Sequence, residues 1–230
     1  SDELEEDDGE HCTTVVTNGG LLIGHNEDWD EDSAEDICIL KRICGGVTSL
    51  ELYYYGCPLG GVALSMSSNG AIQAINSLDC LDQRIGVPKM LLARRLSQVR
   101  NVAVELPYLL RIPRSSGFAH MLIDNAGKMT LVETTATREA VSTPKLPFAH
   151  TNHVLAPSLV AAQGRPEPSS VKRYDAACRM VLPNMTADRL NSVLDDRSAG
   201  SSASVFNRNT IARAVVDLAR RSVSIWLARE

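Results

Sequence analysis

The sequence is poor in aromatic residues and has no long apolar run. Phe, Trp and Tyr make up 4% of the 230 residues, whereas hydrophobic residues as a group make up 44%. The core must therefore be built from aliphatic side chains. No stretch approaches the roughly 18 apolar residues that a membrane-spanning helix needs, and the N-terminus shows neither region of a signal peptide. We expect a globular protein of the cytoplasm that makes no contact with a membrane.

Clusters of positive charge are also missing. The formal net charge is −5, and seven acidic residues lie within the first ten positions. The rest of the chain is close to neutral and has no basic stripe interleaved with aromatic residues, which is the pattern typical of nucleic-acid binding. We therefore expect no nucleic-acid partner.

The cysteines show no metal-binding or disulfide pattern. They stand at positions 12, 38, 44, 57, 80 and 178, with no CxxC pair and no zinc-type spacing to histidine. His150 and His153 have HxxH spacing, but the sequence offers no third ligand beside them. We expect no metal and no cofactor, and we expect five of the six cysteines to be reduced packing residues.

Turn signals between β-branched runs predict antiparallel hairpins. Asn-Gly or Asn-x-Gly between such runs is typical of a hairpin turn. The predicted strand pairs are 13–17 with 21–26, 61–67 with 71–76, 118–124 with 128–134, and 210–218 with 222–228. The segment 31–60 is apolar, and its pattern assigns no structure to it.

Helices are predicted between the hairpins. Pro88 suits the first turn of a helix over 89–99, Asn101 suits the cap of a helix over 102–111, and Ser169 or Ser170 suits the cap of a helix over 171–181. In the last helix, the apolar stripe is expected to be Val171, Tyr174, Cys178 and Val181 or Leu182. Strands followed by helices and more strands favour an α+β fold with antiparallel sheets, in one domain over residues 12–230.

The first predicted strand begins abruptly at Cys12. Residues 1–11 are expected to be an acidic, solvated leader because like charges repel and nothing there can be buried. A two-residue turn would place Cys12 opposite His25, and a three-residue turn would place it opposite Asn26. Both turns bring Asp28 near the thiol, with Glu27 and Asp30 as alternative carboxylates.

A cysteine at such a boundary can become N-terminal if the bond between His11 and Cys12 is cut. The freed α-amine has a reference pKa of roughly 7.7–8.0, and the thiol has one of about 8.5. The two groups can share a proton, so the nucleophile carries its own base. The alternative, an inert cysteine in an edge strand, remains open on spacing alone.

Motifs along the whole chain resemble the acyl-CoA:isopenicillin N acyltransferase-like family of N-terminal nucleophile hydrolases, related to bile salt hydrolases and penicillin V acylases. The motifs cover residues 12–228 and are Cys12-Thr13-Thr14, Gly24-His25-Asn26-Glu27-Asp28-Trp29, Asn69-Gly70 with Gln73-Ala74-Ile75-Asn76, Gly86-Val87-Pro88, Ser116-Gly117-Phe118-Ala119-His120, His150-Thr151-Asn152-His153 and the segment 170–179. The resemblance implies a four-layer αββα sandwich and a precursor that cuts itself between His11 and Cys12.

The resemblance also implies roles for individual residues. Cys12 would be the nucleophile, and Asp28 would hold its freed amine or orient the thiol. Asn152 would donate to the oxyanion, with the backbone at Asn76 as a second donor. Arg208 would support the nucleophile.

Two expectations concern the neighbours of these residues. Arg213 is the second choice, behind Arg208, for the supporting arginine. His25 and Asn26 are expected beside the substrate. Bile salt hydrolases carry an arginine where His25 stands, which indicates a different substrate or charge balance.

We expect an N-terminal cysteine amidohydrolase that cleaves a linear amide, in an N-acyl amine or N-acyl amino acid, through an acyl-thioester. An acyltransferase that moves an acyl group from acyl-CoA or an amide to an amine is the first alternative. A degenerate, non-catalytic binding protein is the second, and a metal-dependent hydrolase is the third. The expected partner is a small-molecule acyl amide, and the assembly is left open between a homo-oligomer and an α/β heterodimer formed by self-cleavage.

Overall fold

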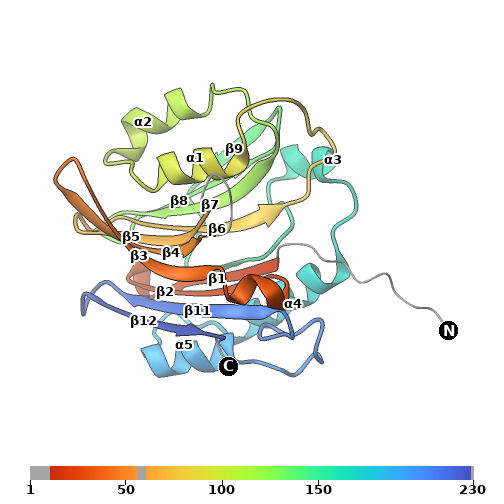
Figure 1. Ribbon diagram of the computed structural model, residues 1–230. Helices are drawn as coiled ribbons and strands as arrows, with labels where there is room; N and C mark the ends of the chain where they lie inside the picture. The colour runs from red at the N-terminus through yellow and green to blue at the C-terminus, as the bar shows by residue number, and fades with distance from the viewer. Residues whose placement is uncertain (1–10, 56–60, 229–230) are drawn as a thin grey trace.

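Two antiparallel sheets lie face to face, with helices on both outer sides (Figure 1). The structure is a computed structural model that describes residues 11–55 and 61–228. The predicted α+β architecture, an αββα sandwich, is confirmed. The predicted acidic leader falls outside the described residues except for His11, which is already the first residue of a strand.

The smaller sheet has five strands in the order β10-β1-β2-β11-β12. The predicted hairpins at the two ends of the chain are confirmed, with ends shifted by one or two residues. β1, which begins with His11 and Cys12, lies between β10 and β2 rather than at an edge. The strands are β1 His11–Thr17, β2 Leu22–Asp28, β10 Phe148–His150, β11 Thr210–Asp217 and β12 Ser222–Leu227.

The larger sheet has seven strands in sequence order, from β3 to β9. Segment 31–60, to which the sequence pattern assigned no structure, contains a short 3-10 helix η2 (Glu31–Ala34) and the β3–β4 hairpin. This hairpin turns at Gly45 and Gly46, which have φ angles of 56° and 78°. The strands are β3 Ile37–Cys44, β4 Val47–Tyr54, β5 Gly61–Ser67, β6 Ile72–Leu78, β7 Gly117–Ile123, β8 Met129–Thr134 and β9 Glu139–Ser142.

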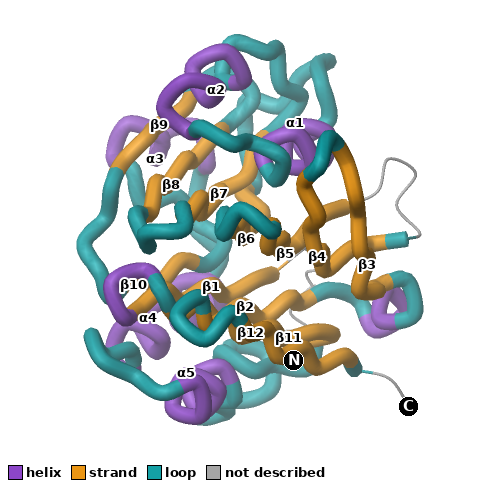
Figure 2. Tube along the Cα trace, turned by 90° about the vertical axis from the view of Figure 1, so that its left-hand side faces the viewer, coloured by secondary structure: helices purple, strands orange, loops and turns teal. Residues whose placement is uncertain are grey.

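The helices form the two outer layers, which Figure 2 shows edge-on above and below the sheets. α1 and α2 cover the seven-stranded sheet, and α4 and α5 cover the five-stranded sheet. The ranges are α1 Lys89–Leu96, α2 Val102–Leu109, α3 Val160–Gln163, α4 Pro168–Met180 and α5 Ala187–Leu194, with 3-10 turns η1 Asn18–Gly20 and η3 Pro157–Leu159. No helix within the described ranges has the length and apolarity to cross a bilayer.

The predicted cap of the second helix is confirmed, but the third helix differs from its prediction. The Asn101 side chain accepts the N–H of Val104 at 3.2 Å. α4 begins at Pro168, a residue well suited to a first turn, and it turns Ser170, Arg173, Ala176 and Ala177 inward. The expected stripe was wrong, since Val171 and Cys178 are exposed. Small alanines let α4 approach the sheet closely, and its longest inward side chain is a cation.

Both faces of β1 and β2 are buried because each faces a different layer. Successive side chains in a strand point to opposite faces. Val15 packs against Ala177 and Leu190 under the helices, whereas Val16 packs against Leu64 in the core between the sheets. By this alternation, Cys12 and Thr14 face the opposite sheet, and Thr13 faces α4.

The turn of the first hairpin is longer than predicted, and this changes the register. Asn18 to Leu21 form a four-residue loop, and Thr17 pairs with Leu22. Asn18, at φ 52°, donates from its backbone to Pro183 O at 3.2 Å and from its side chain to Met185 O at 2.7 Å. Hydrogen bonds to a distant loop therefore fix the turn. Cys12 consequently pairs with Glu27, and neither of the two predicted pairings was right.

The cysteines only partly match the expected packing role. Cys80 is buried, Cys38 is half-buried, and Cys44 and Cys178 are exposed. Burial raises the pKa of the Cys80 thiol to about 11, so this thiol stays protonated at neutral pH. Cys57 lies outside the described residues.

His120 is buried on the outer face of the seven-stranded sheet, where its Nδ1 accepts Gln73 Nε2 at 3.2 Å. Burial, together with the charge of Arg114, lowers the pKa of His120 from 6.5 to about 3. Between these two values the unfolded chain binds a proton that the folded chain does not bind. The free energy of unfolding therefore rises with pH across this window, by about 1.4 kcal/mol per pH unit from this group.

Replacing His120 by Gln should remove that contribution. Urea unfolding at several pH values between 4.5 and 6 should give a slope of stability against pH that is smaller by about 1 kcal/mol per unit in H120Q. Above pH 6.5 the two slopes should agree. Parallel lines from pH 4.5 to 6 would show that His120 is protonated in the folded protein.

Candidate active site

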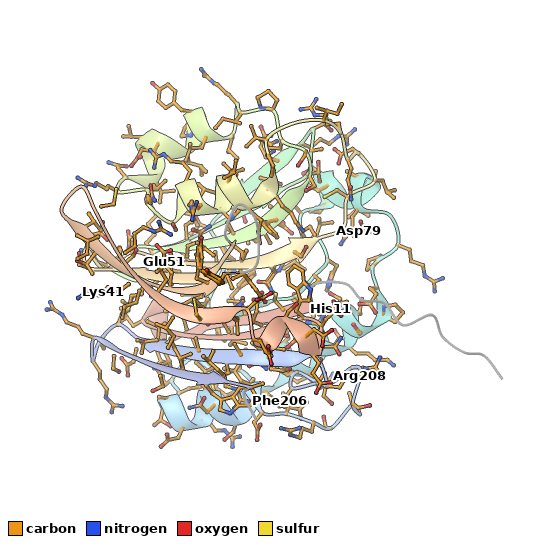
Figure 3. All side chains as sticks on the ribbon, in the orientation of Figure 1. His11, Lys41, Glu51, Asp79, Phe206 and Arg208 are labelled. Carbon is orange, nitrogen blue, oxygen red and sulfur yellow. The ribbon has the colours of Figure 1, made fainter. Side chains whose placement is uncertain are left out.

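The first residue of β1, His11, lines a large cleft, and the next residue, Cys12, is buried. The cleft has a volume of about 950 Å³, and Trp29, Asn152 and His11 are among its lining residues. His11 Nδ1 also lies 3.4 Å from the Glu167 carboxylate. His11 and Asp79, which also lines the cleft, lie at the same end of the molecule in Figure 3. The bond between His11 and Cys12 therefore stands where the cleft meets the buried sheet.

The thiol of Cys12 points into a buried polar cluster between the two sheets. Its Sγ donates to Glu27 Oε2 at 3.2 Å. The same carboxylate contacts His25 Nε2 at 2.7 Å and accepts the Tyr54 hydroxyl at 2.8 Å. Cys12 and Glu27 are 2% and 3% exposed, and His25 is fully buried. Glu27 therefore joins β2 to β4 of the opposite sheet while it contacts the thiol.

The hydrogen bonds of Thr14 fix the tautomer of His25. The Thr14 hydroxyl donates to Asn76 Oδ1 at 2.8 Å, which uses its only proton. The Nδ1 of His25, 2.9 Å from the same hydroxyl, must then carry a proton and donate it. A further proton lies between His25 Nε2 and Glu27, because two bare acceptors do not stay 2.7 Å apart. One proton is therefore held between His25 and Glu27.

Cys12, His25 and Glu27 also form a possible set of metal ligands. Their ligand atoms lie within 4.8 Å of one another, the one such group of His, Cys, Asp and Glu in the part of the chain that the structure describes. Thiolate, imidazole and carboxylate are the ligand types of zinc. The hydrogen bonds within the cluster account for its geometry without an ion. The expectation that the protein needs no metal remains a prediction.

The backbone of Cys12 is held from the opposite face. Its N–H donates to Asn152 Oδ1 at 2.8 Å, and its carbonyl accepts Arg173 Nη1 at 2.7 Å. Arg173 also donates to Thr13 Oγ1 at 3.0 Å and to Asn152 Oδ1 at 2.8 Å. Arg173 is completely buried in α4. One guanidinium thus ties the helix to the start of β1 and to the loop after β10.

Asn152 is held rigidly while it lines the cleft. Its backbone N–H donates to Ser170 Oγ at 2.8 Å, and its carbonyl accepts Gln163 Nε2 at 3.0 Å. Its side-chain Nδ2 donates to Ser77 O at 3.1 Å. The predicted role of Asn152 as an oxyanion donor is compatible with this position.

Asp28 lies on the face of β2 opposite to that of Glu27. It is fully buried and accepts Asn207 Nδ2 at 2.6 Å through Oδ2. Burial raises the pKa of this carboxyl, whereas the charge of Arg173 and the hydrogen bonds of Thr210 and Asn207 lower it. Its Oδ1 has no hydrogen-bond partner within the described residues. Asp28 pairs with His11 in the ladder, so it stands beside the bond that would be cut, whereas Glu27 is the predicted carboxylate seen in contact with the thiol.

The structure brings a different arginine to Cys12 from the one that was predicted to support it. Arg208 is exposed in the loop before β11, and Figure 3 shows it at the edge of the molecule. Arg213, the second choice, contacts Asn26 Oδ1 at 3.3 Å and Asp195 Oδ1 at 3.0 Å. Arg173 is the arginine that touches Cys12. It lies within the segment 170–179 that carries the resemblance, but no local sequence pattern marks its side chain as buried.

Two further predicted residues serve to hold the framework. Asn26 points away from the cleft and donates to Leu194 O and Val205 O, both at 2.8 Å, so it is corrected from a substrate neighbour to an anchor for α5. The Asn76 side chain, which accepts from Thr14, also donates to His150 O at 3.4 Å. It joins the two sheets directly beneath the cluster.

The remaining histidines stand apart from the thiol. His150 Nε2 contacts Glu133 Oε1 at 3.3 Å, and His153 Nδ1 contacts Ser170 Oγ at 2.8 Å. His150 and His153 therefore use different partners and share no ligand. His25 is the one histidine in the cluster around Cys12.

Comparisons with known proteins agree on a family and a fold. A family model described as acyl-coenzyme A:6-aminopenicillanic acid acyl-transferase matches residues 15–230. Penicillin V acylase from Agrobacterium tumefaciens superimposes with a TM-score of 0.65 at 12% identity, over 95% of this chain and 83% of that chain. A search of curated protein sequences finds no match.

Two structures of conjugated bile acid hydrolase from Clostridium perfringens are also similar. A cysteine-to-alanine mutant gives a TM-score of 0.56 at 13% identity, over 96% of this chain and 92% of that chain. An arginine-to-leucine variant gives 0.57 at 11% identity, over 94% and 92%. At these identities the likeness establishes the shared N-terminal nucleophile hydrolase fold.

Removing the Arg173 side chain should destabilise the protein strongly. In R173M, the Cys12 carbonyl, Thr13 Oγ1 and Asn152 Oδ1 lose donors, and the buried Asp28 loses its compensating charge. We expect the free energy of unfolding to fall by about 3–5 kcal/mol, the usual cost of breaking a buried charge pair. The matched variant R208M, at an exposed site, should change it by less than about 0.5 kcal/mol. Urea unfolding of both variants checks this, and equal effects would remove the special role of Arg173.

Proposed function

The chain belongs to the acyl-coenzyme A:6-aminopenicillanic acid acyl-transferase family, and from this premise we propose that it is an amide-cleaving enzyme with Cys12 as its N-terminal nucleophile. The chain would cut itself between His11 and Cys12. The mature enzyme would then cleave a linear amide, such as an N-acyl amine or N-acyl amino acid, through an acyl-thioester.

One observation carries this proposal: three separate groups hold the three functional parts of residue 12. Asn152 accepts its N–H, Arg173 donates to its carbonyl, and Glu27 accepts its thiol. An inert packing cysteine needs no such arrangement, and two residues in contact with it, His11 and Asn152, line the 950 Å³ cleft. Buried polar side chains that converge on one residue beside a cleft are typical of an active site.

Asp28 supports the role of the freed amine. Its Oδ1 is buried without a hydrogen-bond partner in the described part of the chain, and its neighbour across the ladder is His11. A buried acceptor without a partner is costly. An α-ammonium group at Cys12 would supply both a donor and a compensating charge once residue 11 has left.

The reaction follows from these positions. The Cys12 thiolate attacks the substrate carbonyl carbon, and the side-chain amide of Asn152 stabilises the oxyanion. The Cys12 amine takes the thiol proton and passes it to the leaving amine, so a thioester forms. The same amine then activates water, which hydrolyses the thioester and regenerates the thiol. No step uses a cofactor.

The cleft carries both signs of charge, which suits a polar acyl amide. Lys89 and Arg165 line it together with Asp79 and Glu167, and Trp29 adds an apolar wall. Its volume is within the range of roughly 300–1,000 Å³ that is usual for small-molecule sites. Assembly as a homo-oligomer or an α/β heterodimer, and a location in the cytoplasm, remain predictions.

Acyl transfer is the second candidate, because the description of the matched family names an acyl-transferase. It differs only in the second half of the reaction, where an amine instead of water attacks the thioester. Incubation of the matured protein with N-acyl amino acids or acyl amines, and separately with acyl-CoA and an amine acceptor, would distinguish the two. Release of amine in water supports hydrolysis, and formation of a new amide from acyl-CoA supports transfer. Activity that disappears with a chelator would instead support a metal-dependent hydrolase.

Maturation should depend on the Cys12 sulfur. Intact-mass measurement and N-terminal sequencing of the purified protein should find a chain that begins at Cys12. In C12A the bond between residues 11 and 12 should remain intact, since an N-to-S acyl shift needs the thiol. A fully active protein that still carries residue 11 would contradict the proposal, and inactivity of both cut and uncut protein would favour a binding role.

Asn152→Ala should lower kcat by roughly 10²–10³-fold, the usual cost of one oxyanion donor. The matched variant Asn184→Ala changes an exposed loop asparagine and should leave kcat unchanged. Steady-state kinetics of both variants, with thermal unfolding as a check of folding, tests this. A folded N152A protein with normal kcat would remove Asn152 from the catalytic groups.

A further inference from the structure

We propose that Glu27 is the catalytic base for self-cleavage, taking the proton of the Cys12 thiol while the bond to His11 is still intact. This inference rests on the proposed function and extends it to a step that the proposed function leaves without a base. The α-amine can act as a base only after the cut has released it. The first cut therefore needs another proton acceptor.

The backbone nitrogen of Cys12 cannot be that acceptor. In the uncut chain it is a peptide nitrogen, whose lone pair is delocalised into the carbonyl group. It acts as a hydrogen-bond donor, to Asn152 Oδ1 at 2.8 Å. The acceptor must therefore be a side chain that reaches Sγ.

Glu27 reaches Sγ directly. The thiol donates to its Oε2 at 3.2 Å, and the two residues are register partners on the same face of the β1–β2 pair. Directly opposite side chains of antiparallel strands lie close enough to interact. Because both residues lie within strands and are buried, the contact is preorganised rather than formed by a loop.

His25 lowers the free-energy cost of this proton transfer in a buried site. The His25–Glu27 pair is net neutral and holds one proton between its members. If Glu27 takes the Cys12 proton, the pair becomes positive and the sulfur becomes negative, so the cluster of three stays neutral. An adjacent cation favours the thiolate, and a neutral cluster avoids the large cost of an isolated buried charge. Tyr54, which donates to Glu27 Oε1, holds the carboxyl group in place.

Self-cleavage breaks one bond for each bond that it forms. Glu27 removes the proton from sulfur, and the thiolate attacks the carbonyl carbon of His11. The new S–C bond forms, the C–N bond between residues 11 and 12 breaks, and the proton taken from sulfur ends on the Cys12 nitrogen. Water then hydrolyses the thioester, which leaves a carboxyl group on His11 and regenerates the Cys12 thiol and the Glu27 carboxylate.

The test compares self-cleavage with amide hydrolysis in the same variants. Glu27→Gln keeps the size of the side chain and removes its basicity. In the full chain, E27Q should slow the appearance of the cut product by about 10²–10⁴-fold, the usual contribution of a general base. Glu27→Asp should restore part of the rate, because a carboxylate returns at a longer distance.

Glu51→Gln is the matched control. Glu51 is also a buried glutamate in a strand, held by Arg42 and Ser49, and Figure 3 shows it well away from His11. E51Q should leave the cleavage rate unchanged even if it lowers stability. Thermal unfolding of the three variants separates folding defects from a loss of chemistry.

A second form of the protein separates maturation from turnover. The residues before Cys12 are replaced by a protease recognition sequence and are removed after the full chain has folded. In this form the α-amine is present as a base, so E27Q should lose a clearly smaller factor in kcat for the best amide substrate than it loses in the rate of self-cleavage, where a general base contributes about 10²–10⁴-fold.

Each result has one meaning. A loss of self-cleavage in E27Q that clearly exceeds its loss of hydrolysis after protease release supports the inference. Wild-type self-cleavage in folded E27Q, or an equal loss in both reactions, overturns it. If the wild-type chain does not cut itself but hydrolyses amides after protease release, the inference fails and the hydrolase function stands. If the released wild-type protein is inactive on every amide and thioester tried, the proposed function fails.

Discussion

The buried guanidinium of Arg173 is the constraint on which the site depends. Burying an arginine is costly unless its donors are used and its charge is compensated. Here the Cys12 carbonyl, Thr13 Oγ1 and Asn152 Oδ1 accept its protons, and Asp28 supplies the opposing charge. Satisfying one side chain therefore brings together α4, the start of β1, the end of β2 and the loop after β10, which are far apart in the sequence.

Because side chains alternate between the two faces of a β-strand, different groups contact Cys12 on each face of β1. On the α4 face, Arg173 and Asn152 hold the peptide groups of Cys12. On the inter-sheet face, Glu27 and His25 handle its thiol. Both faces of β1 are covered in a four-layer sandwich. Both polar environments are therefore shielded from solvent, and their hydrogen bonds are strong. An edge strand exposed on one face could not provide this.

The cluster of Cys12, His25 and Glu27 between the two sheets differs from the site that the family resemblance alone would imply. Bile salt hydrolases carry an arginine where His25 stands. A guanidinium keeps its charge and does not exchange protons at ordinary pH, whereas an imidazole bonded to a carboxylate can share one. The pair His25–Glu27 thus offers proton transfer next to the thiol without a permanent charge. Below 25% identity a shared fold does not carry chemistry with it, and such substitutions decide what the site can do.

The sequence by itself determined the four predicted hairpins, the cap at Asn101, the sandwich architecture through its motifs, and the candidates Cys12, Asp28 and Asn152, because turn chemistry and strand periodicity act over a few residues. Only the tertiary structure decided the register and the arginine. The first turn is held by Pro183 and Met185, so its length, and with it the pairing of Cys12 with Glu27, depends on a loop about 165 residues away. Arg173 and Arg208 are equally plausible cations in a sequence. Which one is buried depends on whether acceptors from other segments surround it, and no local pattern contains that information.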